Sequence, residues 1–150
     1  MVFDDKDNLL LIKRGQAPAF GKWHAPGGKL EPGESMIVAC KREVKEETGI
    51  VGIEIDCLLA VVERRVEGFH YVIMDFLAHL NQVDVVNPVA ADDVLDARWV
   101  AESDLAGVDL AEGLWPILRT ACLMRRHQVQ AGLRDISGAE SDFLPLLDWR

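Results

Sequence analysis

The chain has 150 residues, a length that fits one domain with a core of its own. Hydrophobic residues make up 49% and charged residues 27%, as in ordinary globular proteins, and no apolar run approaches the roughly 20 residues that span a bilayer. The net charge of −9 disfavours a nucleic-acid polymer as partner, because such binding depends on basic groups that neutralise phosphates.

Two short strands are predicted at the start of the chain, over residues 2–5 and 9–14, with a polar turn between them. This start is acidic and alternating, unlike a signal peptide. The three cysteines lie far apart in apolar contexts, which favours buried thiols and a reducing cytoplasm.

A loop over residues 16–27 leads to a helix predicted over about 35–48. Ser35 is a candidate N-cap for this helix, and Gly49 is placed to end it. One face of the helix is apolar and carries Ile37, Cys40 and Val44.

The same helix gathers acidic side chains beside its apolar face. At about 100° per residue, Glu43 and Glu47 stack on one side and Glu46 lies next to them. Like charges at these spacings repel one another unless a cation neutralises them, so they predict a site for a hard divalent cation, Mg²⁺ or Mn²⁺. The alternative is a solvated acidic face that is paired with Lys41 and Lys45.

A longer pattern over residues 28–50 favours the first interpretation. Gly28 is followed after five residues by Glu34, and after seven more by the run Arg42-Glu43-Val44-Lys45-Glu46-Glu47-Thr48-Gly49-Ile50. At every defined position this resembles the Nudix box, G-x5-E-x7-R-E-U-x-E-E-x-G-U, in which U is a bulky apolar residue. The preceding run Gly21-Lys22-Trp23-His24-Ala25-Pro26-Gly27-Gly28 is similar to the family's G-x-W-x-x-P-G-G. The resemblance covers about residues 2–125 and implies a hydrolase of diphosphate linkages.

The resemblance also implies roles for individual residues. It implies that the metal is bound by Glu43, Glu46, Glu47 and the backbone carbonyl of Gly27, that Arg42 orients Glu43, and that Glu34 pairs with Arg42. These roles are chemically reasonable, because a planar guanidinium holds a carboxylate in a fixed orientation. Glycines at 27 and 28 also allow the backbone to approach a metal closely.

The second half of the chain predicts more strands and one helix. The expected elements are a long antiparallel pair over 53–63 and 69–80, an acidic loop over 81–95, a strand over 97–101, a helix over 111–126 and a tail over 127–150. In the helix, the inward face carries Leu114, Ile117, Leu118 and Cys122. The order predicts a single α/β domain over 1–150, and the resemblance implies an α/β/α sandwich with a mixed sheet between helices.

Several residues outside the box are further candidates for the site. Asp93, ahead of Asp92, is the first candidate for the acid that many family members add from a later loop, against the alternative of a solvated loop. Glu63, Glu67 and Glu102 also remain possible. Candidates for substrate binding are Lys13 and Arg14, which otherwise form a solvated strand end, Gly28, and Trp23, which otherwise packs beneath the loop.

The expected substrate is a small nucleotide, a nucleoside diphosphate linked to another group, as in ADP-ribose. The segment Asp92-Asp93…Trp99-Val100 resembles the bacterial ADP-ribose pyrophosphatase-like or MutT-like group. A MutT-like nucleoside triphosphate pyrophosphohydrolase, acting also on oxidised nucleotides, is the alternative, and a non-catalytic nucleotide-binding module is the second. The apolar segment 143–147 is expected either to dock on its own domain or to bind a second copy, and a homodimer is predicted.

Overall fold

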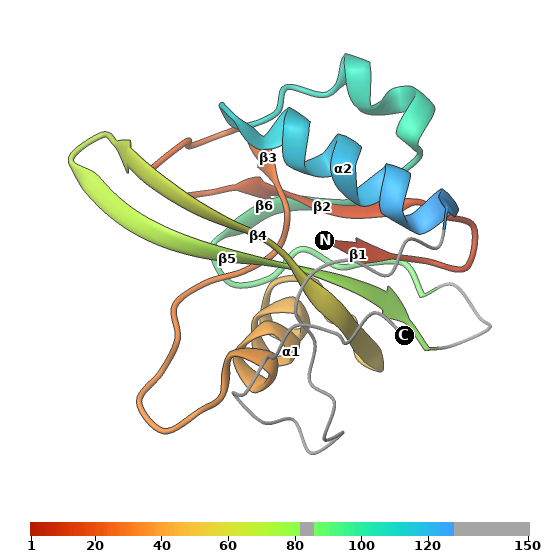
Figure 1. Cartoon of the computed structure of the whole chain (residues 1–150). Helices are drawn as coiled ribbons and strands as arrows, with labels where there is room; N and C mark the ends of the chain where they lie inside the picture. Colours follow the sequence, from red (N-terminus) through yellow and green to blue (C-terminus); the bar gives the residue numbers. More distant parts are fainter. Residues whose placement is uncertain (82–85, 128–150) are drawn as a thin grey trace, which may run out of the picture.

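The computed structural model describes residues 1–81 and 86–127 (Figure 1). Helix α1 (Met36–Thr48) and helix α2 (Leu114–His127) cover opposite faces of a six-stranded sheet, which confirms the predicted sandwich. The sheet is mixed, because β1 and β5 are parallel and the other pairs are antiparallel. Its order is β3-β2-β1-β5-β4, with β6 paired to β2. The strands are β1 (Val2–Phe3), β2 (Leu9–Arg14), β3 (Trp23–His24), β4 (Ile53–Val66), β5 (Phe69–Leu80) and β6 (Val94–Val100).

Strand β2 is buried on both of its faces, because a helix covers each side of the sheet. Leu9 and Leu11 belong to the core cluster beneath α2, together with Leu118 of that helix. Leu10 points to the other side and joins the cluster beneath α1 that contains Val44. The apolar run at the start of β2 therefore holds this strand in the core, and Arg14 at its other end reaches the pocket described below.

Helix α1 begins and ends at the predicted residues. The Ser35 hydroxyl accepts a hydrogen bond from the Val38 backbone N–H at 3.2 Å, as an N-cap does. Gly49 adopts a left-handed conformation, with φ of 70°, and its N–H donates to the Lys45 carbonyl. Ile37 and Val44 of the predicted apolar face are buried and Cys40 is half-buried, so this face of the helix is turned inward.

The structure differs from the sequence prediction near the first turn and in the loops. Strand β1 ends at Phe3 because the Asp4 carboxylate turns the chain, accepting hydrogen bonds from backbone N–H groups of Lys6 and Asn8. The loop predicted over 16–27 contains strand β3, which pairs with β2.

The boundaries of the later elements also differ. Strand β4 continues to Val66, β6 starts at Val94, a short helix follows at Glu102–Gly107, and α2 runs over Leu114–His127. Residues 82–85 and 128–150, which include most of the predicted tail, lie outside the described residues. Neither α-helix in the described ranges is long and apolar enough to cross a bilayer.

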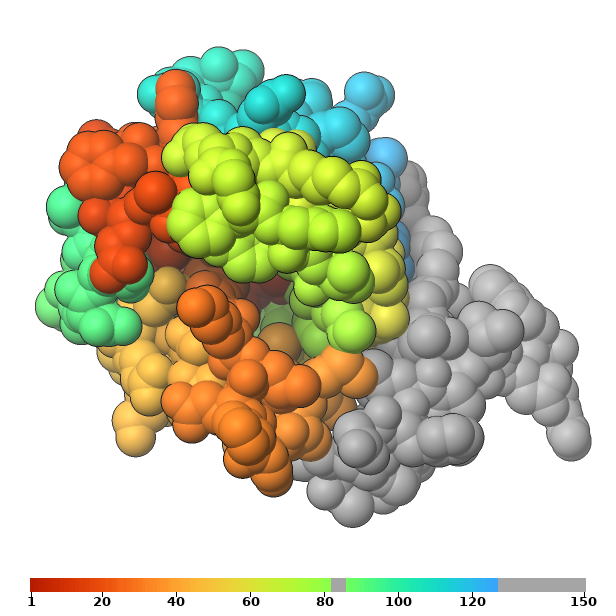
Figure 2. Space-filling view, turned by 90° about the vertical axis from the view of Figure 1, so that its left-hand side faces the viewer, coloured from red at the N-terminus to blue at the C-terminus, as the bar shows by residue number. Residues whose placement is uncertain are grey.

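Strands β4 and β5 form a hairpin that extends beyond α1 (Figure 1). Its turn places Glu67 and Gly68 at φ of 51° and 80°, as a tight two-residue hairpin turn requires. Figure 2 shows a hollow beneath this hairpin, bounded below by the orange segment that leads into α1. The fold therefore leaves an open space between the hairpin and the acidic helix.

Candidate active site

The Arg42 guanidinium connects three of the acidic side chains. Its Nε and Nη2 donate to the two carboxylate oxygens of Glu34 at 3.0 and 2.7 Å. Its Nη1 donates to Glu43 at 2.8 Å and to Glu46 at 3.0 Å. These hydrogen bonds raise the pKa of Arg42, and the bond to Glu34 has the largest effect. In return, the guanidinium lowers the pKa of Glu34. The pairing predicted between Arg42 and its carboxylates is thus present, and it ties the loop before α1 to the helix.

Glu47 is the most buried acid of the site, with 5% of its surface exposed. Its Oε2 accepts a hydrogen bond from the Gly27 backbone N–H at 2.8 Å. Burial is the main cause that raises the pKa of Glu47 to about 7, and the nearby charges of Glu43 and Asp93 add to it. A nearby cation would therefore relieve an unfavourable buried charge.

Gly28 leaves space for the Glu43 carboxylate. A Cβ at this position would lie 2.2 Å from Glu43 Oε1, which is far inside van der Waals contact. The sequence predicted that the backbone at Gly28 comes close to a metal. In the structure this backbone lies close to the carboxylate of Glu43.

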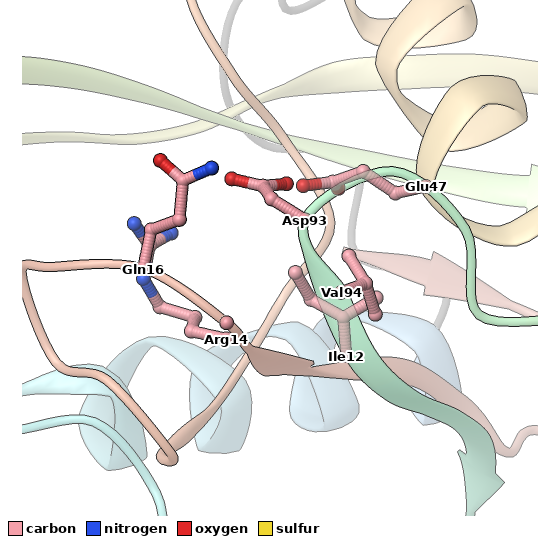
Figure 3. A pocket seen from close by; sticks show the side chains of 7 residues that line it. Ile12, Arg14, Gln16, Glu47, Asp93 and Val94 are labelled. Carbon is pink, nitrogen blue, oxygen red and sulfur yellow. The ribbon is translucent and has the colours of Figure 1, made fainter.

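Asp93 and Glu47 line one small pocket, although 46 positions separate them in the sequence. Figure 3 shows their carboxylates directed toward each other, with Arg14 and Gln16 on the other side of the pocket. The segment that leads to Asp93 is attached to the end of α1, since Val89 N–H donates to the Thr48 carbonyl and Ala91 N–H donates to the Glu47 carbonyl. The structure thus brings Asp93 and Arg14, both candidates from the sequence, into one pocket with Glu47 of the box helix.

The other acidic candidates have partners elsewhere. Glu63 contacts Arg65 and His70 on the hairpin, at 2.6 and 2.7 Å. Glu67 accepts from the Ala19 backbone N–H at 3.2 Å, and Glu102 pairs with Arg126 at 2.8 Å.

Two predicted substrate-binding residues lie outside the pocket. Trp23 packs against the core cluster beneath α2, and the Arg98 guanidinium carbon lies 5.1 Å from the centre of its ring, so packing is its observed role. Lys13 is paired with Asp96 across the β2–β6 ladder and does not line the pocket that Arg14 lines. Gln16 was not predicted, because a polar residue in a loop carries no spacing signal in a single sequence.

The acidic residues fit a hard divalent cation by their chemistry, since they supply carboxylate oxygens around a buried site of negative charge. Within residues 1–81 and 86–127, however, no group of three or more acidic, histidine or cysteine side chains is arranged to hold a metal ion. In this arrangement Arg42 contacts Glu43 and Glu46, while Glu47 accepts from the Gly27 N–H. Arg42 contacts one oxygen of Glu43 and one of Glu46, so each carboxylate keeps a second oxygen with which it can bind a cation.

Comparison with known proteins gives one family. Residues 1–121 match the family model of the NUDIX domain. The chain is 36% identical over 102 residues to human 8-oxo-dGDP phosphatase NUDT18, covering 67% of this chain and 30% of that protein. It is 50% identical over 48 residues to the ADP-ribose pyrophosphatase of Methanocaldococcus jannaschii, covering 31% of this chain and 28% of the relative.

The solved structures agree in fold. A NUDIX hydrolase from Nitrosomonas europaea matches with a TM-score of 0.70 and 28% identity, covering 87% of this chain and 73% of that one. This chain spans about 30% of the length of the curated relatives just described.

Proposed function

Because the chain belongs to the NUDIX family, we propose that it is a metal-dependent hydrolase that cleaves the diphosphate linkage of a nucleoside diphosphate derivative. The observation that carries this proposal is the pocket in which Glu47 of the complete box meets Asp93 and Arg14. The names of the two relatives support the substrate class, since 8-oxo-dGDP and ADP-ribose both contain a diphosphate attached to a nucleoside.

In the proposed site, Glu43, Glu46 and Glu47 would hold Mg²⁺ or Mn²⁺ together with the Gly27 carbonyl. When bound, such an ion withdraws negative charge from the diphosphate oxygens. Arg42 orients Glu43 through the hydrogen bond at 2.8 Å, and Arg14 offers its positive charge to a phosphate from the opposite side of the pocket.

Asp93 is the proposed base. It takes a proton from a water molecule whose oxygen forms a bond to phosphorus, while the bridging P–O bond breaks and its electrons stay on the leaving phosphate. The hollow beneath the β4–β5 hairpin leaves space for the rest of the substrate (Figure 2).

A panel of nucleotides assayed with Mg²⁺ tests this proposal. ADP-ribose, 8-oxo-dGDP, dGTP and 8-oxo-dGTP should be compared by kcat/KM, with products identified by mass spectrometry. We expect the two diphosphate compounds to be cleaved fastest. Faster release of pyrophosphate from the triphosphates would favour the MutT-like alternative, and saturable binding without turnover would favour the non-catalytic module.

Replacing Asp93 with asparagine should lower kcat by about 10² and leave KM nearly unchanged, because a general base acts mainly in the transition state. Steady-state kinetics on the best substrate of the panel measures this. Asp92→Asn and Glu67→Gln are matched controls and should stay near wild type. Near-wild-type kcat for Asp93→Asn, with a loss in one control, would move the base to that residue.

We also propose a homodimer. Val61, Val72 and Met74 on the hairpin are 61%, 63% and 45% exposed, and Val61 lies opposite Met74 in the strand pairing. This group of exposed apolar side chains supports a partner surface. Light scattering at micromolar concentration should give about twice the chain mass of 16.7 kDa. A mass near that of one chain would contradict the proposal.

A cytoplasmic location is proposed on the basis of the cysteines. Cys40, Cys57 and Cys122 form no disulfide, and Cys57 and Cys122 are buried. Cell fractionation with an antibody to the native protein would test the location, and recovery from an oxidising compartment would contradict it.

A further inference from the structure

Gly15 and Asp93 touch each other where β2 leaves the sheet and β6 enters it. The Gly15 backbone N–H donates to the Asp93 carbonyl at 2.8 Å. A Cβ on Gly15 would lie 2.2 Å from that carbonyl oxygen and 3.1 Å from its carbon, and both atoms belong to the backbone. Any side chain at position 15 must therefore push the segment that carries Asp93 away from β2.

A bulge in the same strand pair sets the direction of this segment. Lys13 pairs with Asp96, but the next residue, Arg14, pairs with Val94, so Leu95 is an extra residue in β6. Because side chains alternate between the faces of a strand, one extra residue changes the face on which all preceding side chains lie. Bulges redirect side chains in this way at the ends of strands and next to active sites.

The segment is also held at its other end. Val89 and Ala91 donate their backbone N–H groups to the carbonyls of Thr48 and Glu47, the last residues of α1. The chain from 89 to 94 therefore spans from the box helix to Gly15, and Asp93 lies at the Gly15 end. This attachment fixes the Asp93 carboxylate relative to Glu47 in the shared pocket (Figure 3).

We propose that Gly15, together with the bulge at Leu95, is a positioning element that directs the Asp93 carboxylate into the pocket opposite Glu47. The inference rests on the proposed function, because it explains how the proposed base is held in place. Gly15 itself touches no reacting atom in this proposal and acts only through Asp93. Its requirement for glycine is steric, since the obstacle is the neighbouring backbone.

Gly15→Ala tests the proposal against Gly107→Ala, a matched control at which an added Cβ meets no atom within 4 Å. We expect Gly15→Ala to lower kcat by tenfold to a hundredfold with KM within about twofold, and Gly107→Ala to leave both constants unchanged. The double variant Gly15→Ala/Asp93→Asn should be no slower than Asp93→Asn alone, because both changes remove the same contribution. Wild-type kcat in Gly15→Ala, or losses that multiply in the double variant, would overturn the proposal.

Two further measurements keep the test decisive. Amide hydrogen exchange of Ala91, whose N–H binds the Glu47 carbonyl, should be at least tenfold faster in Gly15→Ala and unchanged in Gly107→Ala. This readout needs no substrate, so it separates failure of the positioning proposal from failure of the proposed function.

If Gly15→Ala does not fold, deletion of Leu95 replaces it, because the 54% exposed side chain of Leu95 contributes little to the core. That deletion restores a regular register and should give the same loss in kcat, and unchanged kcat would overturn the proposal.

Discussion

Replacing Glu47 with glutamine is expected to lower kcat by about 10² to 10³, the range found when one key electrostatic group is removed from a site. The substitution keeps the size of the side chain and its hydrogen bond from the Gly27 N–H, but it removes the buried negative charge. Steady-state kinetics with circular dichroism measures the loss of rate and the retention of the fold.

Two comparisons make this result specific. Glu112→Gln is the control, because its side chain is 89% exposed and its only described ion pair, with Arg64, is long at 3.9 Å. Glu46→Gln should also lose activity, because it removes one of the carboxylates proposed to bind the metal. A folded Glu47→Gln variant with most of its activity would mean that the acidic helix face serves only as surface.

Removal of divalent cations is expected to abolish turnover. Burial raises the pKa of Glu47 most, and the charges of Glu43 and Asp93 add to it. The site without a cation therefore holds unfavourable negative charge and cannot neutralise a diphosphate. Activity should fall to background in EDTA and return with excess Mg²⁺ or Mn²⁺. Ca²⁺ added in the same excess controls for general charge screening, and undiminished turnover in chelator would exclude the proposed chemistry.

The metal-free protein should also show a defined pH dependence. The pKa of Glu47 is raised from 4.5 to about 7, so the folded state binds a proton that the unfolded state releases between these values. The stabilising contribution of Glu47 is therefore complete below about pH 4.5 and is lost as the pH rises through about 7. Urea unfolding of wild type and Glu47→Gln in EDTA measures it, and a difference between them that is constant from pH 4.5 to 8 would contradict it.

The sequence predicted the box helix well because its signals are local. Ser35 and Gly49 cap the helix through contacts within a few residues, and the Arg42 contacts join groups on one helix and its preceding loop. Asp93 was only a candidate by resemblance to other family members, with a solvated loop as the alternative, and its position beside Glu47 comes from the fold.

Other features depended on distant parts of the chain. Strand β3 has two residues and exists only because it pairs with β2. Strand β6 starts three residues before the predicted start at 97, because Arg14 and Gly15 provide partners for this part of the chain. Glu46 contacts Arg42 whereas Glu47 accepts from the Gly27 N–H, and the helical spacing of the two glutamates does not predict these different partners.

The β4–β5 hairpin, which extends beyond α1, can change in sequence more easily than the box helix. The box helix and the ends of β2 and β6 are connected to the core, whereas Val61, Val72 and Met74 of the hairpin are exposed and add little to the folding free energy. Mutations there cost one copy of the chain little stability, so selection on them comes through the proposed dimer contact. The same folded domain can thus change its partner surface by drift on a single ribbon, without any change in the box helix.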